Sequence, residues 1–562
     1  MRLLLVILQA LFAAVQLVGA GPDRQLPHPV LRMGSPLRGK AILRADQTHL
    51  KKLAAWHRMP ESRLREVVAS DSAICMDARG RLHYTCAALS ALINARASVE
   101  PRSTTLQGNT ASEVFKLHSL PGANLTIHID FDGHTTVGTD WNTNVSSGSP
   151  IITPPYDSDG NTSAFSDAEL ASIKQIWEQV SEDYAPFKVD VTTEDPGPDA
   201  LTKSNPSDAS YGIRICVGGS SYDWYGSGAG GVAYLNSFDE PTDTPAFVFE
   251  AQLGNGNPHY TAEAVAHEAG HTFGLLHDGV TGGTPYFEGH ADWASIMGVS
   301  YYKAITHWSK GEYASANNVH DDLALIAGYT GLRTDDHGGT TSTATPTGAS
   351  AVTQRGLIHS RSDRDFFKFA TEAGPVTIQG SLTTAKPNLN IELRIYDSLG
   401  TLLLTQSPTS ELSANLSLTV PRGTYYVRVD GVGEGSPIND GFSDYGSVGN
   451  YELKILPTEN SSISVAGIAM SRQFSSEGAI TTAIVRVVNQ NGVPVSGVQV
   501  AGTWSGNTSG VVSRATVTNG QAAFSTSRLL TVGTTTFTVN ELAHAMATYN
   551  ASANRESSDS IQ

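Results

Sequence analysis

The chain has 562 residues, 40% of them hydrophobic, which is enough for about three or four globular domains. Its formal net charge is −17 at pH 7, but residues 21–116 hold 15 Lys or Arg against 8 Asp or Glu, whereas residues 117–562 hold 21 against 46. The acidic majority argues against nucleic acid as a partner. The two oppositely charged regions can attract one another, although two unrelated solvated surfaces would give the same counts.

The first 20 residues have the pattern of a secretory signal. Arg2 precedes a largely apolar run from Leu3 to Val18, and small residues follow where a signal peptidase would cut. We therefore expect residues 1–20 to be a signal peptide and the mature protein to be secreted. Because no later stretch approaches 18 uninterrupted apolar residues, no membrane anchor is expected in the mature form. An N-terminal transmembrane anchor is the alternative.

The basic segment 21–117 lies between this signal and the first strand of a globular region, which is the position of a pro-region. Cys75 and Cys86 flank a turn-like stretch, and a hairpin there would bring the two cysteines opposite each other. In an oxidising compartment this arrangement predicts a disulfide. We expect the activation cut between Ser103 and Leu120.

Residues 118–333 have the pattern of an α/β (α+β) domain. Ser166 and Glu169 form a capping box in front of a helix whose apolar residues recur at helical spacing. The order of the elements suits a mixed sheet with helices packed on it. Cys216, inside a predicted strand, is expected to be a buried inert thiol. Strands are predicted at residues 125–131, 187–193, 213–217 and 232–235, and a closing helix at 317–327.

Two loops in this region allow a binding interpretation as well as a plain structural one. The run from Asp157 to Asn161 resembles a calcium loop, but Thr162 and Ala168 stand where such a loop needs glycine and glutamate, so an Asp/Gly turn is favoured and Ca2+ stays possible but unsupported. The glycine-rich stretch 226–234 could let a substrate backbone pair with a strand edge, and a tight surface loop is equally allowed.

The stretch from His267 to His277 has the spacing of a catalytic zinc site. His267 and His271 lie one helical turn apart on the same face, so both imidazoles can reach one Zn2+ ion. Gly274 can reverse the chain and bring His277 back as a third ligand. Glu268 is then placed to deprotonate a water at the open position. The alternative is a buried amphipathic helix with ordinary hydrogen-bonded histidines. It would leave Glu268, Gly274 and His277 unexplained.

A thiolate from the pro-region at the open position of such a site, keeping a precursor silent, is the alternative to the disulfide. His134, His259, His290 and His307 lack a metal-ligand spacing, and structural or surface roles are expected for them.

This motif, followed by Met297 in the run Ala-Ser-Ile-Met-Gly, resembles the metzincin clan of zinc endopeptidases, and Asp278 after the third histidine is similar to the adamalysin-type branch. The resemblance implies that the three histidines bind zinc, that Glu268 is the general base and acid, and that Met297 is structural. Some metzincins carry a metal-assisting tyrosine two residues after that methionine. Val299 stands there in this chain, with Tyr301 and Tyr302 further on.

The C-terminal half is predicted to be all β. Residues 334–350 are small and polar, as in a linker, and strand patterns with turns follow in 351–456 and 460–552, so two β-sandwiches are expected before a disordered tail at 553–562. The first resembles the pre-peptidase C-terminal domain, which the family uses as an accessory or removable module. The second is similar to bacterial immunoglobulin-like repeats, and it acts as a spacer or docks a cell-surface or matrix target.

Together these patterns predict a secreted zinc endopeptidase that hydrolyses protein or peptide substrates. Two other classes fit parts of the chain. A non-catalytic metal-binding adhesin would explain the C-terminal sandwiches but not Glu268. A zinc hydrolase with a non-peptide substrate would use the same site.

Overall fold

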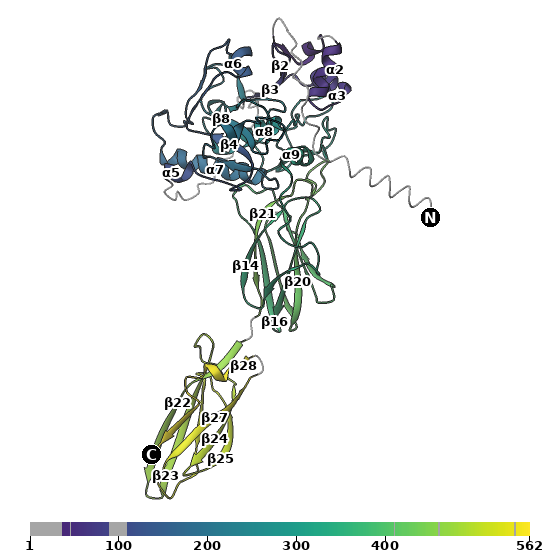
Figure 1. Cartoon of the computed structure of the whole chain (residues 1–562). Coiled ribbons are helices and arrows are strands. Elements are labelled where there is room, and N and C mark those ends of the chain that lie inside the picture. The colour runs from purple at the N-terminus through teal and green to yellow at the C-terminus, as the bar shows by residue number, and fades with distance from the viewer. Residues whose placement is uncertain (1–35, 45–46, 89–109, 410, 459–460, 545–546) are drawn as a thin grey trace, which may run out of the picture.

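The computed structural model describes residues 36–44, 47–88, 110–409, 411–458, 461–544 and 547–562. The expected signal peptide, and residues 103–109 of the segment expected to hold the activation cut, lie outside these residues. Figure 1 shows a mixed α and β part followed by two all-β parts, so the protein is multidomain and mostly β. Within the described residues, no helix combines the length and apolar character needed to cross a membrane.

An eight-stranded mixed sheet organises the first part, in the order β1-β2-β3-β9-β10-β8-β4-β7. Strands β7, β4, β8 and β10 are mutually parallel, β9 is antiparallel to β10, and β3 from the expected pro-region is antiparallel to β9. The strands are β1 (Leu37–Arg38), β2 (Ile74–Met76), β3 (Leu82–Ala87), β4 (Leu125–Asp130), β7 (Asp190–Thr192), β8 (Tyr211–Val217), β9 (Ala229–Tyr234) and β10 (Ala246–Val248).

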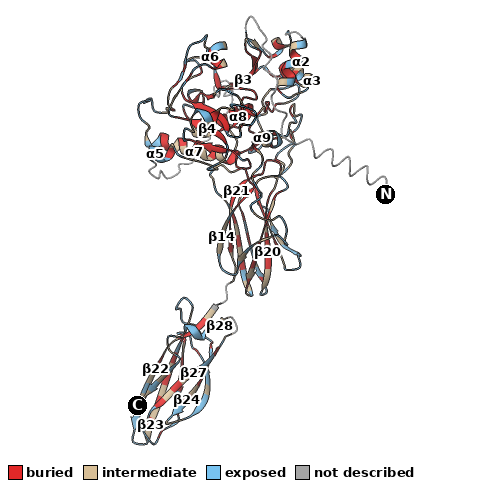
Figure 2. Cartoon of the chain, viewed as in Figure 1, coloured by how far each residue is buried: buried red, intermediate tan, exposed pale blue. Residues whose placement is uncertain are grey.

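Two long helices, α7 (Asp167–Asp183) and α8 (Pro258–Thr272), pack against each other and contribute to one core with this sheet (Figure 2). The capping box predicted for α7 is confirmed, because the Ser166 side chain accepts from Glu169 N and the Glu169 carboxylate accepts from Ser166 N. The remaining elements are α5 (Ala111–Val114), α6 (Asp140–Asn144), β5 (His134–Thr136), β6 (Ile151–Thr153), η2 (Pro198–Leu201), η3 (Glu250–Gln252), β11 (Trp293–Ser295), β12 (Ile305–His307) and α9 (Asp322–Thr330).

The expected pro-region folds into a small subdomain with its own apolar core, into which Leu276 also packs. It consists of β1, the 3-10 helix η1 (Gly39–Arg44), the helices α2 (Gln47–Trp56) and α3 (Glu61–Ser70), and the hairpin β2-β3. The predicted disulfide is wrong, because Cys75 and Cys86 are both free and buried. The hairpin exists, but its register places Cys75 opposite His83, so Cys86 lies beyond the paired segment.

The first sandwich encloses one apolar core between a five-stranded sheet, β13-β15-β20-β17-β18, and a four-stranded sheet, β14-β21-β16-β19. The expected linker is partly strand, because β13 lies within residues 334–350 and pairs with β15. The strands are β13 (Thr345–Gly348), β14 (Val352–Ile358), β15 (Arg364–Thr371), β16 (Gly374–Leu382), β17 (Ile391–Tyr396), β18 (Leu402–Gln406), β19 (Ala414–Val420), β20 (Gly423–Gly431) and β21 (Gly449–Leu456).

The second sandwich has two four-stranded sheets, β26-β23-β22-β28 and β25-β24-β27-β29. The tail predicted to be disordered instead contains β29, which pairs with β27 through backbone hydrogen bonds that composition does not reveal. Its elements are β22 (Ser461–Ser475), β23 (Gly478–Asn489), β24 (Gln499–Gly506), β25 (Gly510–Ala515), β26 (Gln521–Ser525), β27 (Thr535–Ala543), β28 (Ala547–Tyr549), η4 (Ala551–Ala553) and β29 (Ser558–Ile561).

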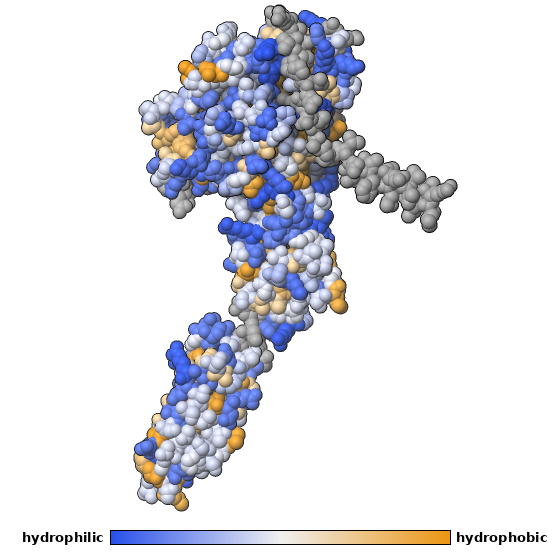
Figure 3. Space-filling model, viewed as in Figure 1, coloured by the Kyte–Doolittle hydropathy of each residue, from blue (hydrophilic) through white to orange (hydrophobic). Residues whose placement is uncertain are grey.

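The surface in Figure 3 is mostly hydrophilic, with the apolar side chains of the described residues in small separate groups, as is usual for surface that stays in contact with water.

The first part and the first sandwich are joined by both apolar and polar contacts. Tyr445 of the sandwich belongs to the apolar core of the first part. His307 lies 2.7 Å from the Asn388 carbonyl, and Asn388 Nδ2 donates to Asp183 at 2.8 Å.

Candidate metal centre

Helix α8 and the turn after it bring three imidazoles together. His267 and His271 project from one face of α8, which ends at Thr272. Gly274 follows with φ of 93°, and a Cβ there would overlap the Asn236 side-chain amide, so glycine is required for both the backbone conformation and the close approach. The chain then reverses and returns His277 to the other two histidines, with ring centroids 4.9 to 5.2 Å apart.

The three imidazoles converge on one sulfur atom. Cys86 Sγ lies 3.4 Å from Nε2 of His267, 3.4 Å from Nε2 of His271 and 3.5 Å from Nε2 of His277. All four residues are buried and could hold a metal ion. Of the two readings of the pro-region cysteines, this geometry therefore favours a thiol at the metal centre.

The Nδ1 atoms of the three histidines all face hydrogen-bond acceptors. Each Nδ1 therefore carries the ring proton, and each Nε2 has a free lone pair. His267 Nδ1 lies 2.8 Å from the Ile296 carbonyl, and His271 Nδ1 lies 2.8 Å from the Leu275 carbonyl. His277 Nδ1 lies 2.7 Å from Oδ2 of Asp71, a residue of the pro-region. Hydrogen bonds of this kind are typical of metal-binding histidines, because they set the tautomer and orient the ring.

Burial keeps the first two histidines neutral. It lowers the pKa of His267 to about 3 and that of His271 well below its ordinary value, and the neighbouring imidazoles lower both further. A neutral imidazole is the form that binds a metal ion.

Glu268 is buried beside the cluster, and its Oε2 has no hydrogen-bond partner among the described residues. Burial raises its pKa to about 8. Strand β9 passes so close that a Cβ on Gly231 would overlap the Glu268 carboxylate. The glycine-rich stretch therefore admits this carboxylate next to the sheet edge, a role that the sequence analysis did not assign to it.

Met297 lies directly beneath α8. A Cβ on Gly270 would come within 2.8 Å of its Sδ, and its carbonyl accepts a hydrogen bond from Asp278 N at 2.9 Å. The Asp278 side chain is buried and accepts from Asn318 Nδ2 at 3.1 Å. The methionine turn is thus tied to the segment carrying the third histidine.

The N-terminal subdomain, which is the expected pro-region, covers the cluster from the sheet edge. Strand β3 pairs with β9 with Cys86 opposite Gly231, so it occupies the edge that faces the histidines. The ring of Tyr84 stacks on His271 and also contacts His277, both with centroids 4.2 Å apart. A substrate strand therefore has no access to this edge while β3 is in place.

The tyrosines considered from the sequence lie to one side. Tyr301 and Tyr302 pack against Tyr260, with centroids 5.9 and 6.0 Å away. Tyr286 is a further tyrosine beside a candidate ligand, and its ring centroid lies 4.3 Å from that of His277. Its hydroxyl oxygen is buried and makes no hydrogen bond within the described part of the chain.

The other histidines considered from the sequence have partners away from this cluster. His259 Nδ1 lies 3.0 Å from Gln179, and His290 Nε2 lies 2.6 Å from the Gly441 carbonyl. His307 contacts the first sandwich, and His134 Nδ1 lies 3.7 Å from Asp130.

Two acidic groups also bring oxygen atoms together: Asp157 and Asp159 of the loop before α7 with Glu169 in its first turn, and Asp335 with Asp363 and Asp365 of the first sandwich. In the first group, Asp157 Oδ1 accepts from the backbone N–H of Asp159 at 3.0 Å, as in the Asp/Gly turn that the sequence favours.

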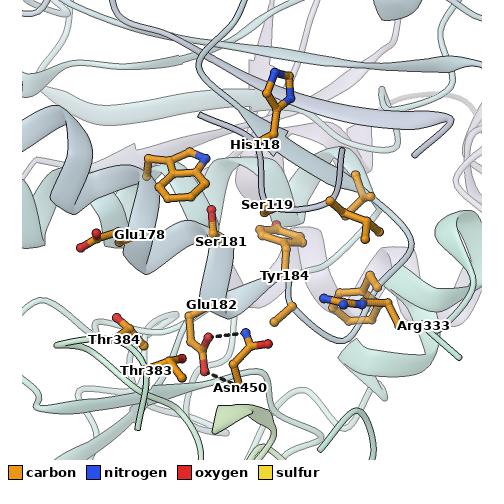
Figure 4. Close-up of a pocket in the computed structure, with 15 residues that line it drawn as sticks. His118, Ser119, Glu178, Ser181, Glu182, Tyr184, Arg333, Thr383, Thr384 and Asn450 are labelled. Carbon is orange, nitrogen blue, oxygen red and sulfur yellow. Dashed lines mark hydrogen bonds between the residues drawn. The ribbon is translucent and has the colours of Figure 1, made fainter. Parts of the chain in front are cut away.

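A separate cleft of about 280 Å³ lies at the junction of α7 with the first sandwich (Figure 4). At its edge Glu182 accepts two hydrogen bonds from Asn450, at 2.9 Å from the backbone N–H and at 2.8 Å from Nδ2. None of the three clustered histidines lines this cleft. Its lining residues belong to the junction between the first part and the first sandwich.

Sequence reasoning missed Asp71, Tyr84 and Tyr286. Each approaches the histidines through tertiary structure, and none stands at a spacing that a linear motif could reveal.

A family model described as metallo-peptidase family M12B, reprolysin-like, matches residues 171–278. The matched range includes the three histidines and Glu268 and ends at Asp278, before Met297. It supports a zinc metalloprotease, since members of that family use zinc. No curated protein matches the chain.

Among solved structures, the pre-peptidase C-terminal domain of a collagenase from Bacillus anthracis is 15% identical, covering 20% of this chain and 93% of that domain, with a TM-score of 0.16. A GH2 β-galacturonidase from Eisenbergiella tayi is 15% identical over 35% of this chain and 34% of its own, with a TM-score of 0.13. A β-glucuronidase from Bacteroides uniformis is 8% identical over 31% and 25%, with a TM-score of 0.11. At these TM-scores the structural matches decide nothing about function.

Proposed function

We propose that this protein is a secreted zinc endopeptidase, made as a latent precursor and active on protein or peptide substrates. The observation that carries the proposal is the convergence of three histidine Nε2 atoms beside a buried carboxylate, Glu268. His267, His271 and His277 are the zinc ligands, and Met297 supports the segment beneath them.

The distances in the cluster fit zinc. Zn–N bonds of about 2.05 Å and a Zn–S bond of about 2.3 Å in a tetrahedron give N···S separations of about 3.5 Å. The separations from Cys86 Sγ to the three Nε2 atoms are 3.4, 3.4 and 3.5 Å. Burial raises the pKa of the Cys86 thiol in the metal-free chain, but a bound cation deprotonates a coordinating thiol.

In the active form, the chain's own residues position the substrate and move the proton. Zinc held by the three histidines would polarise the substrate carbonyl and acidify a water molecule. Glu268 takes the proton from the attacking water and delivers it to the leaving amine. Burial raises the pKa of Glu268 to about 8, which makes its carboxylate a stronger base toward the attacking water. The β9 edge, once free, can pair with an extended peptide.

Latency follows from strand β3. Its Cys86 would supply a fourth ligand to a metal ion held by the three histidines, which would leave no position for the water that catalysis needs. Because the same strand also fills the β9 edge, the precursor excludes both the water and the peptide. A cut between Ser103 and Leu120 would separate the pro-region from the catalytic part.

The C-terminal sandwiches are proposed to act after export. The second sandwich is a spacer or docks a cell-surface or matrix target, and the first is attached to the catalytic part. A non-catalytic metal-binding adhesin remains the alternative function, motivated by the two sandwiches. The buried Glu268, whose Oε2 has no hydrogen-bond partner among the described residues, argues against it, since a purely metal-binding site does not require such a group.

Chelator-reversible digestion of casein tests the function. After release of the pro-region, the enzyme should generate new peptide N-termini, stop with a zinc chelator and recover with added zinc. Hydrolysis of small esters without peptide cleavage would indicate a non-peptide hydrolase instead. Zinc binding without any hydrolysis would favour the adhesin.

A further inference from the structure

The third histidine differs from the other two in the source of its hydrogen-bond acceptor. His267 and His271 face carbonyls of Ile296 and Leu275, which belong to the catalytic part itself. His277 faces the carboxylate of Asp71, which belongs to the pro-region and lies 206 positions earlier. Two ligands are therefore oriented by the catalytic part, and the third depends on a segment that activation removes.

Asp71 is built into this place. It caps the C-terminus of α3, and its own N–H donates to the Val67 carbonyl at 2.8 Å. Its Oδ1 accepts from Ala73 N at 2.8 Å, which leaves Oδ2 for His277 Nδ1 at 2.7 Å. The side chains of His277 and Asp71 are 1% and 6% exposed, so water does not weaken the contact.

A carboxylate in this position does more than accept a hydrogen bond from Nδ1. It fixes the proton on Nδ1, orients the ring and makes Nε2 a stronger base toward a metal ion. The ring of Tyr84, also from the pro-region, lies 4.2 Å from that of His277 and restricts its rotation from another side. The pro-region thus touches His277 at Nε2 through Cys86, at Nδ1 through Asp71 and on the ring.

We propose that Asp71 is a positioning residue for His277, so that the precursor retains zinc more firmly than the chain does after the pro-region is released. The precursor takes up and retains zinc, and release of the pro-region removes the acceptor of the third ligand together with the thiol. The inference rests on the proposed function for the identity of the metal. It adds that the pro-region helps the centre to retain its metal as well as blocking it.

The rate at which uncleaved precursor releases zinc to a chromogenic chelator tests this role. All variants are made with Glu268→Ala, so that self-cleavage cannot occur. Asp71→Asn keeps the shape but replaces one of the two accepting oxygens with an amide NH2 and removes the charge, so zinc release should be about 10- to 100-fold faster. Asp71→Glu, which restores a carboxylate, should recover part of the loss, and Glu61→Gln, at the half-exposed N-terminal end of α3, is the matched control.

Cobalt substitution separates positioning from misfolding. If Asp71→Asn keeps the sulfur-to-cobalt absorption of Cys86 and still releases zinc faster than the control, the role of Asp71 is supported. Release within twofold of the control, with that absorption retained, would overturn it. If Asp71→Asn loses the absorption, the rates of zinc release of Asp71→Glu and Asp71→Asn are compared instead. Asp71→Glu must then release zinc more slowly than Asp71→Asn, or the inference fails. A precursor that never binds zinc would instead refute the proposed function.

Discussion

Cys86 Sγ lies 3.4 Å from His271 Nε2, although the two residues are 185 positions apart. Strand pairing creates this contact, because β3 runs along β9 with Cys86 opposite Gly231, directly above the face of α8 that carries the histidines. The contact places a sulfur atom of the basic N-terminal segment beside the histidines of the acidic remainder. That sulfur lies where a catalytic metal site would need an open position.

Replacing Cys86 with serine should weaken latency. A neutral hydroxyl is a poorer zinc ligand than a thiolate, so uncleaved Cys86→Ser should digest a fluorogenic peptide at a measurable rate, and the pro-region should be lost faster. Cys75→Ser is the matched control, because that thiol is also buried and free but contacts Thr85 rather than the histidines. Equal latency in both variants would rule out the sulfur as the inhibitory group.

Gly231→Ala should lower turnover without removing zinc. The added Cβ would overlap the Glu268 carboxylate and displace it from the attacking water, and misplacement by about 1 Å can cost about 100-fold in rate. Zinc content, measured by atomic absorption, should stay at the wild-type level. Gly328→Ala provides the control, since its added Cβ meets nothing within 4 Å. Unchanged kcat in Gly231→Ala would show that β9 does not position Glu268.

The first sandwich should stabilise the catalytic part. Asn450→Ala would keep the backbone N–H that bonds Glu182 Oε1 but remove the Nδ2 donor to the buried Oε2, at a cost of about 1–3 kcal/mol. Thermal unfolding of the full chain should show the loss. Asn415→Ala, at an exposed position of β19, should change little. Equal melting temperatures would mean that the sandwich is an independent module.

The same junction predicts a pH dependence. Burial raises the pKa of Glu182 to about 7 from its ordinary 4.5, against the lowering effects of Asn450 and Arg333. Between these two values the folded protein keeps a proton that the unfolded chain releases, so the stability from this group falls as pH rises. Relative to Glu182→Gln, the wild type should therefore lose melting temperature between pH 5 and pH 8. A constant difference across that range would contradict the assignment.

The sequence could predict those parts of the fold that depend on local spacing. The capping box at Ser166 and the helix behind it follow from contacts three to four residues apart, and the grouping of the three histidines follows from one helix and one glycine turn. The disulfide prediction failed because hairpin register is set by which residues pair. Cys75 faces His83, a detail that the spacing of the two cysteines does not contain.

The parts that could not be predicted are contacts between distant segments. Asp71 and Tyr84 reach the histidines only because the pro-region adds its strands to the catalytic sheet. The first sandwich resembles a removable module in sequence, yet Tyr445 sits in the catalytic core and Asn388 bonds Asp183. These contacts use ordinary polar and aromatic residues, so no composition or period marks them.

Glu268→Ala tests the central claim most directly. The variant should bind zinc at the wild-type stoichiometry, because the carboxylate is not a ligand, and after release of the pro-region it should lose peptide hydrolysis by at least about 1,000-fold. Casein digestion and zinc content are measured on the same preparation, with zinc-loaded wild type alongside. Full zinc occupancy with no cleavage is the predicted result. Appreciable peptidase activity in the purified variant would contradict the mechanism.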